Sequence, residues 1–491
     1  MGDEKTVSVQ ELKKAAVAFI DEKKTEVLDV NDRIWEFAEL SLMETRSMAL
    51  YCEVLERNGF AVERGICDVP TAFSGTFGSG GPIIGILAEY DALSGLSQAG
   101  ATAVEQPLTQ GAPGHGCGHN MLGAGSLAAA FAVKKFLEDA KVPGTVIFYG
   151  CPGEEGGAGK AFMARAGLWK KLDAALTWHP SETNEVVSGS SNSSIQIEYR
   201  YKGVASHAAG DPELGRSALD AVELLNIGVQ FLREHIPDNA RVHYAIIDGG
   251  GVSPNVVQPT ASVLYMIREN TVHKNLGLVA RVDKIAEGAA LMTDTRLERV
   301  FIDGTADTIP NFTLEKALYK NFQEIGVPKY TDEELAFAAA VKKTYDDRVP
   351  SRLPGGATDT HPEIEAFVRE ASRGGTLVMN DFLIPQCDSR HQSMGSTDVA
   401  DVSWLTPTGQ IHVAARPHNA PGHSWQVVSC GKSTIGHKAV LFAGKVLAAT
   451  AIDLLLDPET LLRAKAEHAE KTKAGYLCPI PDGEPPRVPG E

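Results

Sequence analysis

Short apolar stretches alternate with helical stretches over residues 82–180, and this alternation restricts the fold more than any other feature of the chain. "PIIGILAEYDAL" and "GTVIFYGCPGEEG" each predict a buried strand, and "MLGAGSLAAAFAVKKFLEDA" between them predicts a helix. "LDAALTWHP" predicts a further strand, which we expect Pro180 to break. Strands that alternate with helices form a largely parallel sheet flanked by helices. The sequence therefore predicts an α/β domain.

The pattern changes after residue 192. A Ser-, Gly- and Asn-rich stretch leads into the order strand, helix, strand, strand, helix, strand, which is typical of a compact ferredoxin-like α+β unit. The chain, with 491 residues, is also too long for one ordinary domain. We therefore expect residues 1–192 and 307–491 to form the first domain and residues 193–306 to be inserted into it.

The last third of the chain is harder to interpret. The stretches 311–326 and 436–457 predict amphipathic helices, and 345–385 reads as an irregular insertion. No apolar stretch approaches the length of about 20 residues that is needed to cross a bilayer. We therefore expect no membrane segment.

Composition restricts the partners. The formal net charge is −17, and the chain has no Lys/Arg-rich run, so neither a nucleic acid nor a membrane surface is an expected partner. The seven cysteines are scattered and odd in number, unlike a disulfide framework. A reducing, cytoplasmic location is therefore expected.

Acidic residues and a histidine lie where the predicted strands end. Asp91, Glu154, Glu155 and His179 all follow or close a predicted strand. Because the carboxyl ends of parallel strands meet at one edge of a sheet, we expect these side chains to lie close together.

The stretch "GHGCGHN" raises a further question, because Cys117 can be a metal ligand, a nucleophile or a buried thiol. Cys117 and His119 can face one centre, and Asn120 can cap the following helix. With His423 downstream, this mixed donor set suits zinc, manganese or cobalt. Of the two adjacent carboxylates, one can bind metal while the other carries a proton. A nucleophilic cysteine would leave the acids and the other histidines unexplained.

Several motifs resemble those of one family, in the right order and over nearly the whole chain: "AEYDAL", "GHGCGHNMLGAG", "CPGEEGGAGK", "TWHP", "GVASHAA", "GRSALDAVELLN", "GGGVSPNVVQP", "GSTDVADVSW" and "PGHSWQ". The chain resembles subfamily D of the M20 metallopeptidase family, which comprises amidohydrolases of N-acyl amino acids. Within it, the resemblance is strongest to hydrolases of p-aminobenzoyl-glutamate.

The resemblance implies a catalytic domain with two divalent metal ions, Mn or Zn, and an inserted lid domain that also dimerises. Its implied metal ligands are Cys117, His119, Glu155, His179 and His423. Glu154 is implied to be the general base toward a metal-bridged water, and His207 the group that stabilises the oxyanion, typically in the partner subunit's site. Asn255 and Arg268 are implied to hold the substrate carboxylate.

Two departures from the family pattern concern supporting residues. Relatives outside the subfamily have a His-x-Asp strand end whose histidine binds metal, whereas this chain has Glu89-Tyr90-Asp91. We therefore expect no metal ligand from this stretch, and we expect Asp91 to support the ligands without binding metal itself. Asn120 stands where the subfamily commonly has Asp, which changes the charge near the site.

The sequence therefore predicts a cytoplasmic metal-dependent amidohydrolase that cleaves aromatic-acyl amino acids such as p-aminobenzoyl-glutamate. We expect a homodimer through the inserted domain, or a hetero-oligomer with a paralogous subunit. The alternative is a non-catalytic or supporting member that only binds, in which the metal-ligand pattern would persist without hydrolysis.

Overall fold

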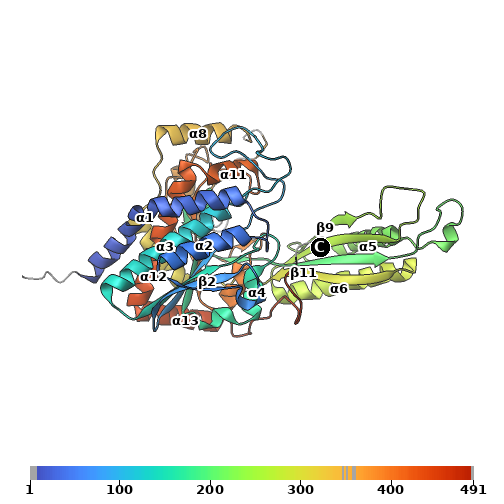
Figure 1. Ribbon diagram of the computed structural model, residues 1–491, viewed down its shortest axis with the longest axis horizontal. Helices are drawn as coiled ribbons and strands as arrows, with labels where there is room; N and C mark the ends of the chain where they lie inside the picture. Colours follow the sequence, from blue (N-terminus) through green and yellow to red (C-terminus); the bar gives the residue numbers. More distant parts are fainter. Residues whose placement is uncertain (1–7, 346–347, 350–351, 356–360, 488–491) are drawn as a thin grey trace, which may run out of the picture.

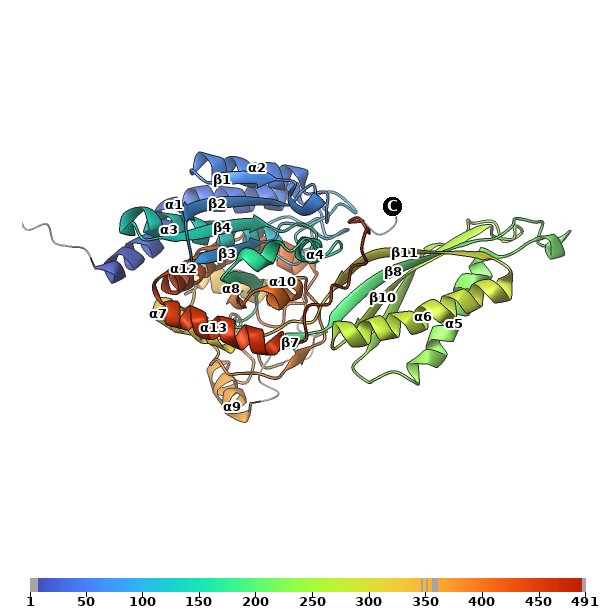
Figure 2. The same cartoon turned by 90° about the horizontal axis from the view of Figure 1, so that it is seen from below.

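The computed structural model describes residues 8–345, 348–349, 352–355 and 361–487. Two parts are evident along the long axis (Figures 1 and 2). The part from β8 (Ser193–Lys202) to β11 (Arg296–Thr305) extends to one side, and we refer to it as the projecting unit. The remaining described residues form the larger body. The N-terminal helix α1 (Val9–Phe37) and the C-terminal helix α13 (Pro458–Lys471) both belong to this body.

A seven-stranded sheet with the order β1-β2-β4-β3-β5-β13-β6 forms the centre of the larger body. The four central strands β4, β3, β5 and β13 are parallel to one another, and the pairings outside them are antiparallel. The predicted mixed, largely parallel α/β sheet is thus confirmed. Its strands are β1 (Ala61–Arg64), β2 (Phe73–Ser79), β3 (Ile83–Ala88), β4 (Gly144–Gly150), β5 (Ala174–Ser181), β6 (Glu185–Val186) and β13 (Thr408–Ala414).

Helices cover both faces of this sheet, which leaves its central strands buried. α3 (His119–Ala140), α12 (Thr434–Leu456) and α7 (Phe312–Ile325) pack on one face, and α1 lies outside α3 and α12. α4 (Gly159–Arg165) and α10 (Val399–Leu405) pack on the other. A parallel sheet buried on both faces needs apolar residues at nearly every position, which explains the continuous apolar runs in the sequence.

The helix α12 differs from the sequence prediction in two ways. It is not amphipathic, because it packs on the sheet between α3 and α7 and is covered by α1. Among the described residues it is also the one helix long and apolar enough to span a membrane by length and composition, with a mean hydropathy of 2.0, although 72% of that window is buried. Our expectation that no such apolar stretch exists is therefore wrong. The burial identifies α12 as a core helix.

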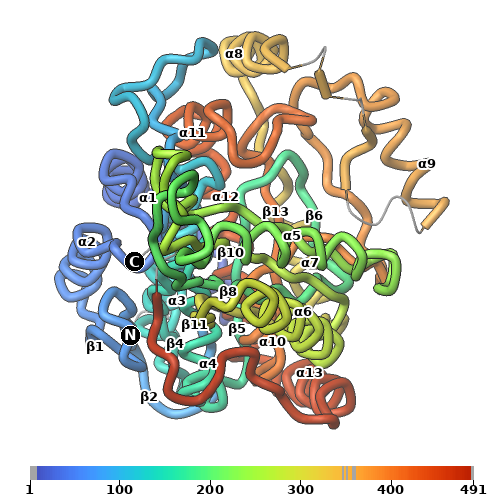
Figure 3. The backbone as a smooth tube through the Cα atoms, turned by 90° about the vertical axis from the view of Figure 1, so that its right-hand side faces the viewer, coloured from blue at the N-terminus to red at the C-terminus, as the bar shows by residue number. Residues whose placement is uncertain are grey.

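The projecting unit is a four-stranded antiparallel sheet with the order β11-β8-β10-β9, covered by two helices. Its chain order is strand, helix, strand, strand, helix, strand, as the sequence predicts. Figure 3, viewed from the end that carries this unit, shows its helices in front of the larger body. Its remaining elements are α5 (Ala218–Arg233), β9 (Arg241–Asp248), β10 (Thr260–Glu269) and α6 (Val272–Thr293).

Pro180 does not break its strand, since β5 continues to Ser181. On one side of β5, the neighbouring strand β3 pairs only with Ala174–Leu176. At Pro180 this side of β5 therefore has no partner among the described strands. A proline can occupy such a position because its missing N–H removes no ladder bond there.

The stretch 345–385 is only partly irregular. It contains the helix α9 (Pro362–Ala371), and α8 (Asp332–Lys342) precedes it. Residues 346–347, 350–351 and 356–360 of this stretch lie outside the described residues. The remaining elements are α2 (Thr45–Arg57), α11 (Trp425–Gly431) and the short pair β7 (Ser190–Ser191) and β12 (Gln392–Ser393).

Candidate metal centre

The candidate site lies at the carboxyl edge of the central sheet. Glu89 and Asp91 follow β3, Glu154 and Glu155 follow β4, and His179 is close to the end of β5. Cys117 and His119 lie at the start of α3, which begins at His119 after Gly118 in the left-handed conformation. The loop between β13 (Thr408–Ala414) and α11 (Trp425–Gly431) brings in His423. Five separate segments therefore meet at one point.

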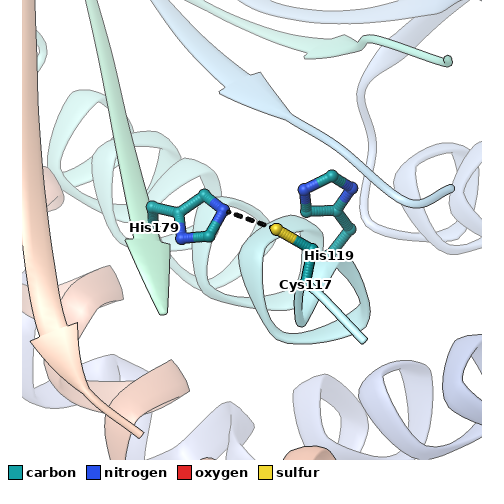
Figure 4. A group of neighbouring side chains, drawn as sticks. All are labelled: Cys117, His119 and His179. Atoms are coloured by element: carbon teal, nitrogen blue, oxygen red, sulfur yellow. Dashed lines mark hydrogen bonds between the residues drawn. The ribbon is translucent and has the colours of Figure 1, made fainter. Parts of the chain in front are cut away.

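Two groups of candidate metal ligands share one thiol. The donor atoms of Cys117, His119 and His179 lie within 4.8 Å of one another, and so do those of Cys117, Glu155 and His423. Cys117 Sγ is 3.3 Å from His179 Nε2 (Figure 4), and His423 Nε2 is 3.4 Å from Glu155 Oε1. Thiolate, imidazole and carboxylate together are the donors that zinc and related divalent ions prefer.

Unpartnered polar atoms in this cluster support a metal site. The buried atoms His119 Nε2 and Glu155 Oε1 have no hydrogen-bond partner among the described residues. A buried polar atom without a partner is costly unless a ligand satisfies it. His119 Nδ1 is engaged with Asp91 Oδ1 at 2.7 Å, which leaves Nε2 to face the centre. The residues present therefore fit bound metal.

The charges of the cluster point the same way. Lys160 is fully buried and pairs with Glu89 at 2.7 Å and with Asp398 at 2.6 Å. Asp91, Glu154 and Glu155 add further carboxyl groups that are buried or largely buried, and their ion-pair partners among the described residues are histidines, with no lysine or arginine. Because buried negative charge must be paired or must bind metal, this excess favours divalent cations.

The pKa values of the imidazoles differ within the site. Burial, together with the nearby imidazoles of His119 and His412, lowers the pKa of His179 well below its usual value. His179 is thus neutral, which is the form that binds metal. The neighbouring Cys117 and Glu155 side chains raise the pKa of His423 to about 10, since both favour a positive charge on its imidazole.

Glu154 is set apart from the other acids by its environment. Burial raises the pKa of its carboxyl group well above the usual value, and the carboxylates of Glu89 and Glu155 add to this effect. Its Oε2 lies 4.0 Å from His119 Nε2, so it borders the ligand cluster. A carboxyl group that readily holds a proton beside a metal site is suited to proton transfer.

A cavity of about 410 Å³ opens over the cluster. Cys117, Glu154, Glu155, His179 and His423 line its floor, and the projecting unit contributes Ser194, Gln196, Met266, Arg268, Asp303 and Thr305. Arg268 comes from β10, and its Nη1 donates to Ser396 Oγ at 3.1 Å. The candidate carboxylate-binding arginine thus shares a cavity with the candidate metal ligands.

His207 and Asn255 do not reach this cavity within one chain. They lie together, because the backbone N–H of Ala208 donates to Asn255 O at 3.0 Å, and both are exposed. Their loops lie beyond Lys202, at the end of β8 farthest from the cavity-lining Gln196. Six residues of strand at about 3.3 Å each separate Lys202 from Gln196 by about 20 Å.

Asn120, the neighbour of His119 in the chain, makes its side-chain hydrogen bonds to residues other than the candidate ligands. Gly118, not Asn120, is the N-cap residue of α3, so our expectation that Asn120 caps this helix is wrong. Its Nδ2 donates to Asn31 Oδ1 and to Gly431 O, each at 3.0 Å. Asn120 therefore ties α3 to α1 and to the end of α11.

The sequence analysis missed several residues that support the site. Glu89, Lys160 and Asp398 form a buried ionic network, and Glu89 Oε2 lies 3.3 Å from His119 Nε2. Ser41 donates to Asp91 Oδ2 at 2.7 Å. The sequence signal for Glu89 was its place directly after a predicted strand, whereas no sequence pattern links Lys160 to Asp398 across 238 positions.

The fold and the site together define a class. The family model for peptidase family M20/M25/M40 matches residues 86–412, and the chain belongs to this family. It is a metallo-amidohydrolase, which confirms the class predicted from the motifs.

Among known proteins, the chain is 44% identical over 470 residues to the B subunit of the p-aminobenzoyl-glutamate hydrolase of Escherichia coli (strain K12), with 95% of this chain and 97% of that protein covered. The likeness to this group that the sequence suggested is thus confirmed.

Solved structures share the fold. The aminobenzoyl-glutamate utilization protein of Klebsiella pneumoniae matches with a TM-score of 0.58 at 17% identity, over 89% of this chain and 97% of that one. The YXEP protein of Bacillus subtilis, a dinuclear metal binding peptidase from the M20 family, matches with a TM-score of 0.54 at 18% identity, over 89% and 99% of the two chains.

Proposed function

We propose that this protein hydrolyses the amide bond between an aromatic acyl group and the amino group of an amino acid, with p-aminobenzoyl-glutamate as the representative substrate. One observation carries the proposal. Two donor groups that share Cys117, the carboxyl group of Glu154 and the guanidinium of Arg268 all border one cavity. The relative named for this substrate, 44% identical, supports the same choice.

The metal content follows from the donor groups. One ion would be held by Cys117, His119 and His179, and a second by Cys117, Glu155 and His423. Divalent ions there, Mn or Zn, would polarise the scissile carbonyl and would lower the pKa of water, so that it could lose a proton and attack at neutral pH. Asp91 orients His119 through Nδ1 and so keeps the ligand nitrogen directed at the centre.

The protein residues supply positioning and proton transfer. Glu154 takes the proton from the attacking water and passes it to the nitrogen of the leaving amino acid, which leaves as an amine. Arg268 binds the carboxylate of that amino acid, because a guanidinium offers two parallel donors to a carboxylate.

We propose that two residues of the site come from another copy of the chain: His207, which stabilises the oxyanion, and Asn255, which helps to hold the substrate carboxylate. His207 and Asn255 lie too far from the cavity of their own chain, at the exposed end of the projecting unit. The edge strand β9 exposes Tyr244, Ile246 and Ile247. An exposed apolar edge strand favours pairing with another chain, and we propose a homodimer through this unit.

A hetero-oligomer with a paralogous chain is the second assembly that an observation favours, since the relative from Escherichia coli is named as one of the subunits of its enzyme. We also propose a cytoplasmic location, because all seven cysteines are free thiols.

The test is a release assay on p-aminobenzoyl-glutamate, hippurate and indole-acetyl-aspartate, with Mn or Zn returned to metal-free protein. We expect p-aminobenzoyl-glutamate to be cleaved with the highest kcat/KM. Two bound metal ions per chain without hydrolysis of any of the three substrates would contradict the proposal. Size measurement of the purified protein, alone and after co-expression with a paralogue, distinguishes the two assemblies.

A further inference from the structure

His412 is a histidine of the cavity for which the proposed reaction has no role. It lies on β13 in register with His179 on β5. Residues paired in register on parallel strands point to the same face of the sheet. The two imidazole rings accordingly lie near each other, with centroids 6.2 Å apart, and both line the cavity. His412 therefore faces the space that a substrate would occupy.

The orientation of the His412 ring is fixed by a carboxylate. Its Nδ1 lies 3.0 Å from Glu185 Oε1, which also accepts a hydrogen bond from Thr183 Oγ1 at 2.7 Å. An ionised carboxylate can only accept, so Nδ1 carries the proton of this contact. In the imidazole with its proton on Nδ1, the other nitrogen, Nε2, is a hydrogen-bond acceptor.

The cavity thus offers different partners on different walls. Arg268, on the projecting unit, is a cationic donor suited to a carboxylate. His412, on the sheet of the larger body, presents Nε2 as an acceptor, and its Nδ1 is held by the carboxylate of Glu185. His412 also borders a second cavity of about 620 Å³, whose charged lining residues are Glu182, Glu185, Glu365, Arg352 and Arg369. A substrate with a carboxylate on one part and an N–H donor on the other complements both walls.

We propose that His412 determines specificity for the acyl part of the substrate, with its Nε2 accepting a hydrogen bond from an N–H donor on that part. An aromatic amine such as the amino group of a p-aminobenzoyl unit is a donor of this kind. The inference rests on the proposed amidohydrolase function and adds which feature of the acyl group is recognised.

Two substrates that differ only in this donor test the proposal. We compare kcat/KM for p-aminobenzoyl-glutamate and benzoyl-glutamate, which lacks the amino group. The wild-type enzyme is expected to favour the first. His412→Leu removes the acceptor while filling similar space, and we expect the ratio of the two kcat/KM values to fall about tenfold, the effect of one lost hydrogen bond in a shielded site.

A second variant separates recognition from packing. His412→Gln retains a side-chain acceptor, and we expect it to keep the ratio within about threefold of wild type. The matched control is His437→Gln, because His437 also pairs with a carboxylate, Asp32 at 2.8 Å, but does not line the cavity. We expect this control to leave both kcat/KM values unchanged.

The outcomes separate the inference from the proposed function. An unchanged ratio in His412→Leu, or an equal fall in His412→Leu and His412→Gln, overturns the role of His412 while leaving the amidohydrolase intact. A metal-loaded wild-type enzyme that cleaves neither substrate overturns the proposed function and the inference with it. Circular dichroism of each variant shows whether it is folded. If His412→Leu is misfolded, its ratio is set aside, and a ratio in folded His412→Gln that falls about tenfold overturns the role of His412.

Discussion

His119 Nδ1 lies 2.7 Å from Asp91 Oδ1, and both residues are buried. The second oxygen of Asp91 accepts hydrogen bonds from Ser41 Oγ at 2.7 Å and from the backbone N–H of Glu155 at 2.9 Å. One carboxylate therefore orients a candidate ligand on α3 and also positions the loop that carries another. The strand end after β3 supplies no predicted ligand, yet it organises the site.

The first prediction concerns this carboxylate. In Asp91→Asn, an amide replaces the group that orients His119, and we expect metal affinity to fall about 10- to 100-fold, as is typical when such a partner is lost. Metal titration followed by calorimetry measures the change. Asp32→Asn is the control, because Asp32 also pairs with a histidine, His437 at 2.8 Å, and neither residue is a candidate ligand or lines the cavity. Equal affinities for the two variants would contradict the role of Asp91.

The second prediction separates binding from proton transfer. Glu154→Gln keeps the shape of the side chain but removes its ability to take a proton, so we expect kcat to fall by about 10²- to 10⁴-fold. Metal content, measured by mass spectrometry, should be retained. A variant that turned over at the wild-type rate would exclude Glu154 as the general base.

The third prediction distinguishes a ligand thiol from a nucleophilic one. Removal of metal with a chelator should abolish activity and expose Cys117 to alkylation, because Cys117 Sγ belongs to both donor groups. Return of Mn or Zn should restore activity and protect the thiol. Peptide mapping after treatment with iodoacetamide measures the protection. Activity that survives chelation but is lost on alkylation would favour the thiol enzyme.

The fourth prediction concerns stability. Lys160 is fully buried between Glu89 and Asp398. Lys160→Met leaves two buried carboxylates without their cation, and we expect the free energy of unfolding to fall by about 3–5 kcal/mol. Urea unfolding of the metal-free protein measures it. In the control Lys473→Met, the lost partner is the exposed Glu470, and little or no change is expected. A similar small effect in Lys160→Met would show that the network does not stabilise the fold.

The fifth prediction concerns pH. Burial raises the pKa of Asp401 to about 8, although Tyr476 and the backbone of Ala306 donate hydrogen bonds to it. Between the ordinary pKa of an aspartate, about 4, and 8, the folded state therefore binds more protons than the unfolded state, so this group destabilises the fold as pH rises through that range. The slope is at most about 1.4 kcal/mol per pH unit.

Asp401→Asn cannot ionise, so its free energy of unfolding should fall less than that of wild type between pH 5 and pH 8. The difference between the two unfolding curves, taken at several pH values, isolates this group from the other acids. Parallel curves for the two proteins would mean that Asp401 is ionised in the folded state at all these pH values.

The sequence predicted the central fold because its strongest patterns were local. Apolar runs mark β3, β4 and β5, and the alanine-rich stretch marks α3. β2 was missed, since "FSGTFGS" is rich in Gly and Ser and carries little strand signal on its own. α12 was misjudged because a core helix enclosed on all sides has no polar face to reveal its environment.

The candidate site was predictable where its residues lie at strand ends or in compact motifs. Cys117 and His119 are two positions apart, and Glu154 and Glu155 are adjacent. The roles of Lys160, Asp398 and His412 could not be predicted, because they arise only from contacts between segments distant in the chain. Such contacts follow from packing and leave no periodic signal in the sequence.

The thiol shared by the two donor groups has one more consequence. Because Cys117 Sγ would serve both ions, each ion lowers the cost of ordering that sulfur for the other, so the two positions are expected to fill together rather than in succession. Oxidation of this one atom would likewise disable both positions at once. The protein is therefore expected to exist as fully loaded or empty molecules, with few in between.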